Sequence, residues 1–151
     1  MKKILFCIML VSVLLLCASC GFEHIEDTNG NDTSLCTLTQ EDLLAEASSY
    51  ISFGSMETRI NDNYSYSVKK LSGVYRLIRF PAEGSSLTIE TSAVLTQGNL
   101  RIVLLCDGEY VADIPLAENQ SITIDDPSGT YSIVLGAESA ELKFTYSYSV
   151  Q

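Results

Sequence analysis

Histidine is the side chain that enzymes most often use for proton transfer near neutral pH, and this chain of 151 residues contains only one. That residue, His24, lies in a polar stretch near the N-terminus and is predicted to be a solvated linker residue. Ser-His and Cys-His nucleophiles and His-ligated metal sites therefore lack a base or ligand in the rest of the chain. The sequence also lacks a phosphate-binding loop and a dinucleotide fingerprint. We expect a protein that is not an enzyme and that uses no cofactor and no metal.

Four carboxylates in predicted turns are the acidic candidates for a site. Asp107 and Glu109 belong to one turn, and Asp125 and Asp126 belong to the next turn along the chain. Glycosidases need only two carboxylates, but Asp107 and Asp126 already serve the turns, and a small domain has little room for a deep cleft. Loop tips present side chains without disturbing the core. We therefore expect these four carboxylates to take part in ligand binding.

A second candidate site consists of tyrosines. The pentapeptide Tyr-Ser-Tyr-Ser-Val occurs at residues 64–68 and again at residues 146–150. Because alternate residues of a strand share a face, the repeats favour a stacking platform for sugars or aromatic ligands made of Tyr64, Tyr66, Tyr146 and Tyr148. The alternative is that both strands draw on the same β-favouring residues and that these tyrosines face the core. The absence of tryptophan weakens the carbohydrate version.

The elements that must position these side chains are strands. Residues 140–151 alternate apolar with polar side chains, which predicts a half-buried strand. Asp107-Gly108 predicts a hairpin, and Asp126-Pro127-Ser128-Gly129 predicts a type I turn. Together with further β-rich runs, the pattern predicts a mainly β fold, an antiparallel, jelly-roll-like β-sandwich of about eight strands, with a closed barrel as the alternative. Those runs are residues 64–69, 74–80, 87–95, 100–106, 110–114, 122–124 and 131–135.

One short helix is predicted at the N-terminus of this domain, over about residues 40–52. Thr39 and Asp42 have the spacing of a capping box, and Gly54 is a plausible terminator. Apolar residues at 43, 44, 47, 50 and 51 fall on one helical stripe. We expect this helix to cover the core.

The first twenty residues carry a targeting signal. Two lysines precede an apolar run, residues 4–16, that is interrupted only by Ser12, which is the pattern of a signal peptide. As a helix the run is about 20 Å long, too short for a hydrocarbon core of about 30 Å. The segment Leu16-Cys17-Ala18-Ser19-Cys20-Gly21 resembles the lipobox of bacterial lipoproteins. The resemblance implies that Cys20 is lipidated and becomes the mature N-terminus after cleavage.

This resemblance predicts a domain organisation and a location. Residues 1–19 would be the signal peptide, residues 20–35 a lipid-anchored flexible tether, and residues 36–151 the β-sandwich domain. The protein would be anchored to the extracytoplasmic face of the cell membrane through its N-terminal lipid. An ordinary secretory signal cleaved near Ser19, or an uncleaved anchor, is the alternative.

The tether contains no calcium loop, since Asp32 and Leu38 stand where Gly and Glu would be needed.

Two cysteines remain for the domain once those of the signal and the lipidation site are set aside. Cys36 and Cys106 would form a disulfide in an oxidising compartment, tying the end of the tether to the central hairpin. Two separate thiols, one of them buried in a strand, are equally compatible with the sequence.

The charge of the chain limits its partners. Without Lys2 and Lys3 the chain has 7 basic against 19 acidic residues, so its net charge falls from −10 to −12. An acidic surface repels phosphate backbones, which excludes nucleic acid as a partner, whereas cationic partners remain open.

Residues 129–146 also resemble the last hairpin of small extracellular β-sandwich modules, such as accessory domains of secreted peptidases and uncharacterised bacterial surface lipoproteins.

Two hypotheses for the function follow. The first is a monomeric, non-catalytic binding or accessory module for an envelope or extracellular ligand. The second is an acidic inhibitor or immunity-type lipoprotein that captures a cationic protein.

Overall fold

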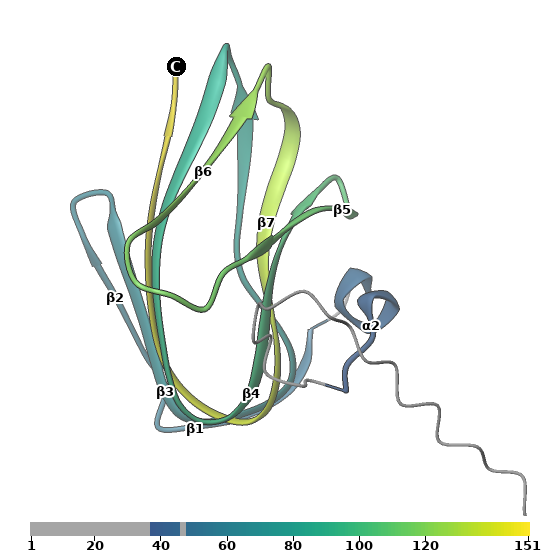
Figure 1. Ribbon diagram of the computed structural model, residues 1–151, viewed down its shortest axis with the longest axis vertical. Coiled ribbons are helices and arrows are strands. Elements are labelled where there is room, and N and C mark those ends of the chain that lie inside the picture. Colours follow the sequence, from purple (N-terminus) through teal and green to yellow (C-terminus); the bar gives the residue numbers. More distant parts are fainter. Residues whose placement is uncertain (1–36, 46–47) are drawn as a thin grey trace, which may run out of the picture. The chain divides into compact units, whose positions relative to one another are not determined.

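Three long antiparallel strands form the centre of the fold. The computed structural model describes residues 37–45 and 48–151 (Figure 1). In this part of the chain a single sheet of seven strands is accompanied by one short helix. In chain order the elements are α2 (Gln40–Leu44), β1 (Ser49–Phe53), β2 (Met56–Ile60), β3 (Asn63–Glu83), β4 (Ser86–Cys106), β5 (Glu109–Ile114), β6 (Gln120–Asp125) and β7 (Ser128–Val150).

Each long strand runs through two layers of a sandwich. In the first layer β2, the start of β3, the end of β7, the start of β4 and β6 lie side by side. In the second layer the order is β1, the end of β3, the start of β7, the end of β4 and β5. Figure 1 shows β3, β4 and β7 curving together at its lower end, where they pass between the layers. The predicted fold class, an antiparallel, jelly-roll-like sandwich with one short helix, is confirmed.

Bends within the long strands β3, β4 and β7 explain why the predicted strands were too many and too short. The register between β3 and β7 shifts around Leu71, and that between β4 and β7 shifts around Gln97. Gly73 and Gly98 have φ values of 101° and 76° there, in a region that glycine adopts easily. The turn signals near these glycines mark bends within continuous strands, so six of the predicted runs merge pairwise into β3, β4 and β7.

The two predicted turns have different outcomes. Asp107 and Gly108 have φ values of 50° and 88° and join β4 to β5, so the hairpin prediction is confirmed. The type I turn is wrong, because Ser128 and Gly129 already belong to β7. β6 pairs with β4, whereas β7 starts against β3, so the connection crosses from one layer to the other. The expected last hairpin is likewise wrong, since residues 128–150 form one strand.

The helix is shorter than predicted. Its capping box is present: the Thr39 hydroxyl accepts from the Asp42 amide at 3.3 Å, and the Thr39 amide donates to the Asp42 carboxylate at 2.8 Å. However, α2 ends at Leu44, and the second half of the expected helix is strand β1. β1 pairs with residues 70–74 of β3. Backbone hydrogen bonding at an open sheet edge therefore decides the structure of this segment, and the predicted helical stripe of apolar residues does not. Two residues of that stripe, Tyr50 and Ile51, are exposed in β1.

The main core fills the space between the layers, and a smaller one lies under α2. Tyr66, Phe144 and Ile102 are among the fully buried side chains between the layers. On the outer side of the second layer, Leu43 of α2 packs with a small apolar cluster, so the helix covers the sheet as expected. That cluster is Val74, Val103, Leu105 and Val134. No helix in the described ranges is long and apolar enough to cross a membrane.

Candidate functional site

Hydroxyl side chains form three rows on the outer side of the first layer. One row across four strands consists of Thr58, Ser65, Thr145 and Ser92, which are register neighbours. Adjacent strands lie about 4.8 Å apart, so the row forms a regular series of hydroxyls. We call the hydroxyl-bearing rows on the outer side of the first layer the hydroxyl face; the neighbouring row, Met56, Ser67, Lys143 and Val94, is not part of it. Two further rows belong to it: Ser147, Glu90 and Ser121, and Ser149, Thr88 and Thr123.

These residues face outward because of the strand alternation. In β7, Leu142, Phe144 and Tyr146 are buried between the layers, and the residues between them must point the opposite way. β3 follows the same rule with Tyr66 and Val68 inside. The serines of the two Tyr-Ser-Tyr-Ser repeats thus reach the surface.

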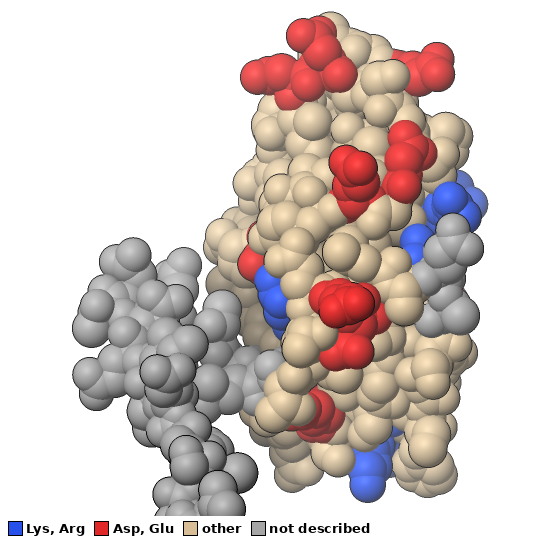
Figure 2. All heavy atoms as spheres, turned by 90° about the vertical axis from the view of Figure 1, so that its right-hand side faces the viewer, with Lys and Arg blue, Asp and Glu red and all other residues tan. Residues whose placement is uncertain are grey.

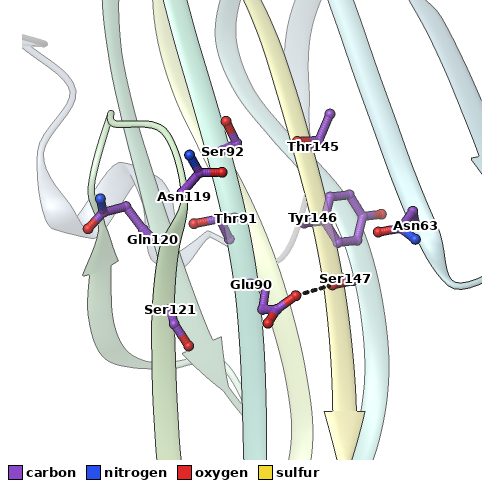
Figure 3. A pocket seen from close by; sticks show the side chains of 10 residues that line it. All are labelled: Asn63, Glu90, Thr91, Ser92, Asn119, Gln120, Ser121, Thr145, Tyr146 and Ser147. Carbon is purple, nitrogen blue, oxygen red and sulfur yellow. Dashed lines mark hydrogen bonds between the residues drawn. The ribbon is translucent and has the colours of Figure 1, made fainter.

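A hollow of about 340 Å³ lies on the hydroxyl face (Figure 3). Its floor is formed by β4 and β7, including Ser92, Thr145 and Ser147. Asn119 and Gln120, at the start of β6, line one side, and Asn63, at the start of β3, lines the other. Figure 3 shows these groups arranged around Glu90.

Glu90 is the charged group of this hollow. Its carboxylate accepts a hydrogen bond from the Ser147 hydroxyl at 3.4 Å, and its side chain is exposed. The adjacent Thr91 is only 4% exposed and lies opposite the buried Tyr146, so its hydroxyl, which has no hydrogen-bond partner among the described residues, faces between the layers. The hollow therefore combines one carboxylate with two kinds of neutral hydrogen-bonding group, carboxamides and hydroxyls.

The loop that carries the carboxamides has a defined conformation. Asn119 has a φ of 54°, a left-handed conformation that asparagine tolerates better than most residues. The Ala93 amide donates to the Ala117 carbonyl at 3.0 Å, which fixes the preceding residues against β4. The Gln120 side chain donates to the Glu118 carbonyl at 3.0 Å.

The four predicted tyrosines come together, but on the inner side of the first layer. Tyr64 and Tyr146 are register neighbours whose stacked rings have centroids 4.9 Å apart, and the Tyr64 and Tyr148 centroids are 6.1 Å apart. Tyr66 and Tyr146 are only 2% and 6% exposed. Burial raises the pKa of Tyr66 to about 12 and also raises the pKa of Tyr146. The cluster is chiefly part of the core, which was the alternative interpretation of the repeat.

A smaller hollow of about 250 Å³ opens where this tyrosine cluster reaches the β2 edge. The Arg59 guanidinium carbon lies 5.0 Å from the centroid of the Tyr64 ring, within range of a cation–π contact. The Tyr75 hydroxyl donates to the Glu57 carboxylate. Burial and that hydrogen bond raise the pKa of Tyr75.

The four predicted carboxylates are all exposed and gather around the start of β7. The Asp107 carboxylate accepts from the Thr130 amide at 3.0 Å, and the Asp126 amide donates to the Ser85 carbonyl at 3.0 Å. Glu83, which the sequence did not single out, joins them because it lies opposite Ser128. Figure 2 shows acidic side chains at the upper end of the fold and others spread down this face. We call this end the acidic end: Glu83, Asp107, Glu109, Asp125 and Asp126.

The remaining candidates are placed only in part. The Cys106 thiol is half-buried and lies 3.6 Å from the Ser128 carbonyl oxygen. Cys20, His24 and Cys36 lie outside the described residues, as do the signal peptide and the tether. Across residues 37–45 and 48–151, no three His, Cys, Asp or Glu side chains are grouped so that they could hold a metal ion.

Sequence reasoning missed the hydroxyl face, although its signal was present. The tyrosines of the repeated pentapeptide are the more obvious candidates because they could stack on a ligand. The serine or threonine at each intervening position is what reaches solvent, and the same alternation continues at Thr88, Ser121 and Thr123. What the sequence could not supply is the pairing that brings these strands together.

The comparisons with known proteins identify no family. No protein-family model and no curated protein sequence matches the chain. Among solved structures, the cupin domain of Drosophila melanogaster CENP-C is similar at 12% identity over 63% of this chain and 77% of that chain, with a TM-score of 0.25. A cupin superfamily protein from Desulfitobacterium hafniense is similar at 10% identity over 68% of this chain and 77% of that chain, with a TM-score of 0.30. Likenesses this distant carry no argument about function.

Proposed function

We propose that this protein is a lipid-anchored, extracytoplasmic, non-catalytic binding module whose hydroxyl face holds a glycan. The observation that carries the proposal is the polar hollow around Glu90. Sugars present closely spaced hydroxyls, each of which donates and accepts hydrogen bonds. Carboxylates, carboxamides and hydroxyls are the side chains that match that pattern.

The size of the hollow and its position on a sheet fit a binding role. At about 340 Å³ it lies at the lower end of ligand pockets, which span roughly 300–1,000 Å³. It sits on a sheet whose strands fix the spacing of the hydroxyls, so little conformational entropy would be lost when a ligand binds.

The chemistry of the lining favours binding over hydrolysis. Glycosidases use two carboxyl groups about 5–9.5 Å apart, whereas Glu90 is the only carboxylate among the residues that line the hollow. A single carboxylate can accept hydrogen bonds from sugar hydroxyls, but it has no partner there to share acid and base roles.

The anchoring part of the proposal rests on the lipobox-like segment ending at Cys20. Two acyl chains, at about 0.8 kcal/mol per buried CH₂, would hold the protein on a membrane stably. The tether that follows would then present the domain to ligands outside the cell.

Titration of the mature protein with a panel of envelope and extracellular oligosaccharides tests the binding site. Glu90→Gln should weaken binding about tenfold, since a hydrogen bond to a charged group contributes about 1.5–3 kcal/mol. The matched control is Glu109→Gln at the acidic end, which should bind as the unchanged protein does. Absence of binding to every oligosaccharide, or equal affinity of Glu90→Gln and the unchanged protein, would contradict the proposal.

A second candidate function is favoured by the acidic end. Its carboxylates come from three neighbouring segments, the end of β3, the β4–β5 hairpin and the β6–β7 connection. Clustered charge of this kind steers a cationic protein and would suit an inhibitor or immunity-type lipoprotein. Binding of a cationic protein that depends on Glu109 and not on Glu90 would favour this function.

A further inference from the structure

One edge of the sandwich carries the most exposed large apolar side chains of the described residues. Ile51 and Phe53 of β1 are 79% and 71% exposed, and Met56 and Ile60 of β2 are 64% and 67% exposed. β1 and β2 are edge strands, each paired with β3. We call Ile51, Phe53 and Met56, which flank the turn at Gly54, the apolar edge. Contiguous exposed groups of this kind mark an interaction surface.

Lysines surround the apolar edge. Lys70 lies directly opposite Phe53 in the register. Lys69 packs beside the turn, since a Cβ on Gly54 would be 3.1 Å from its Cγ. Lys143 lies two strands from Met56, through Ser67, a separation of about 10 Å. These are all the lysines within the described residues, and all three are exposed.

We call the part of the sandwich where β3, β4 and β7 pass between the layers, around Leu71, Gln97 and Ala140, the bend. Two carboxylates also belong to it. Glu138 accepts hydrogen bonds from Thr37 and from the Asn99 side chain, which lower its pKa. Glu141 lies opposite Gln97. Glu57, the neighbour of Met56, is a third carboxylate, but it accepts a hydrogen bond from Tyr75, whose ring packs against the main core. The positive charge beside the apolar edge is therefore that of Lys69 and Lys70, which adjoin Gly54 and Phe53.

The N-terminal segment joins the domain at this bend. The Thr37 amide donates to the Glu138 carboxylate at 3.0 Å. The adjacent Ser139 amide donates to the Ser72 hydroxyl at 3.0 Å, and Ser72 lies opposite Ile51. Glu138 is therefore about two strand spacings, or 10 Å, from the apolar edge. Thr37 follows Cys20 by only 17 positions, so a lipid on Cys20 would keep this bend within reach of the membrane.

We propose that the bend docks on the membrane that holds the lipid anchor. The apolar edge inserts into the headgroup region of an anionic bilayer, and Lys69, Lys70 and Lys143 contact the lipid phosphates. This inference rests on the lipid anchoring in the proposed function. The acidic end lies at the end of the sandwich away from the bend, where the long strands begin and end, and it is repelled by the same anionic surface, which reinforces a single orientation. In that orientation the row Met56, Ser67, Lys143 and Val94 faces the membrane. The hydroxyl rows, with the hollow around Glu90, lie farther from the bend and stay open to ligands.

Tryptophan fluorescence tests the docking, because the chain contains no tryptophan. The full lipidated protein carrying Phe53→Trp is reconstituted in vesicles of phosphatidylglycerol and phosphatidylcholine with brominated acyl chains. Its emission should shift to the blue and lose at least half of its intensity relative to unbrominated vesicles. The matched control is Val111→Trp, 38% exposed on β5 near the acidic end, which should not be quenched. Ile51→Trp repeats the measurement if Phe53→Trp perturbs the circular dichroism spectrum.

Charge variants test the lysines in the same vesicles. Replacing both Lys69 and Lys70 by alanine in the Phe53→Trp protein should weaken the quenching, whereas Arg79→Ala, an exposed cation on the second layer, should not. Unquenched tryptophan at both Phe53 and Ile51 would overturn the inference, and so would equal quenching at Phe53 and Val111.

Flotation of the vesicles separates this inference from the proposed function. Protein that floats with the vesicles without quenching keeps the anchor and refutes the docking. Protein that does not float refutes the anchor and the docking with it. Glycan binding is measured separately and decides neither outcome.

Discussion

Gly136 and Leu43 form a contact whose energy can be worked out from the structure. A Cβ added to Gly136 would lie 2.4 Å from Leu43 Cδ2 and 3.2 Å from Leu38 Cδ1. Gly136 has no positive φ, so alanine suits its backbone and the cost comes from this crowding alone. Leu43 is fully buried against Val103, Leu105 and Val134 and cannot move without losing that packing. We expect Gly136→Ala to destabilise the fold by about 1–3 kcal/mol, the usual cost of overpacking.

The double-mutant cycle isolates the contact. Leu43→Ala alone should cost about 2–5 kcal/mol, because it empties a buried leucine site. In the Leu43→Ala background the new methyl group at Gly136 fills part of that space, so adding Gly136→Ala should cost little or restore stability. The expected coupling is about 1–3 kcal/mol in the stabilising direction.

Urea unfolding of the four proteins, followed by circular dichroism, measures these free energies. A matched control is Gly108→Ala, where an added Cβ meets no atom within 4 Å and only the positive φ of 88° opposes it. Its cost should be the same in the unchanged protein and in the Leu43→Ala background. Additive effects of Gly136→Ala and Leu43→Ala would refute the packing of α2 on β7.

Three further predictions concern the anchor, the charge and the tyrosines. Cys20→Ala should abolish labelling with radioactive fatty acid, and persistent labelling would contradict the lipobox resemblance. The association rate of a cationic protein should fall steeply as the Debye length falls from about 30 Å to about 8 Å between roughly 0.01 and 0.15 M salt. The rate should also fall when the carboxylates of the acidic end are replaced by amides. An association rate that does not depend on salt would contradict electrostatic steering by the acidic end. Because burial raises the pKa of Tyr66 to about 12, the unfolded state loses that proton first and the free energy of unfolding should fall as pH rises above about 10. Tyr66→Phe should flatten this alkaline loss in thermal melts, and an unchanged pH profile would count against the burial.

Local features of the fold were predictable from the sequence. The Asp107-Gly108 hairpin and the Thr39 capping box each depend on a few neighbouring residues, and both are present. The strand positions were also predictable, because alternation of apolar and polar residues survives wherever one side of a strand is buried. In residues 131–137 both sides are buried, so that segment is apolar on both sides apart from Ser132 and does not alternate.

Features that depend on pairing were not predictable. Residues 49–53 form a strand because β3 has an unpaired edge there. The residue types of that segment do not reveal that such an edge is present. The bends at Gly73 and Gly98 resemble turns in sequence, since glycine serves both. The candidate site was only partly predicted for the same reason. Asp107 and Asp126 lie in connections as predicted, whereas Glu109 and Asp125 are the end residues of β5 and β6. The hydroxyl face required the register of β3, β7 and β4.

The passage of three strands through both layers has a consequence for how the protein unfolds. Neither layer can detach from the other as a separate unit, because β3, β4 and β7 each contribute backbone hydrogen bonds to both. The slowest amide hydrogens of the two layers should therefore exchange with one common opening free energy. The pairings also join residues far apart in the chain, such as Phe80 with Tyr131, so folding should be slow and dominated by loop closure. The apolar strands stay exposed during that interval, so a chaperone that binds them would protect the chain from aggregation.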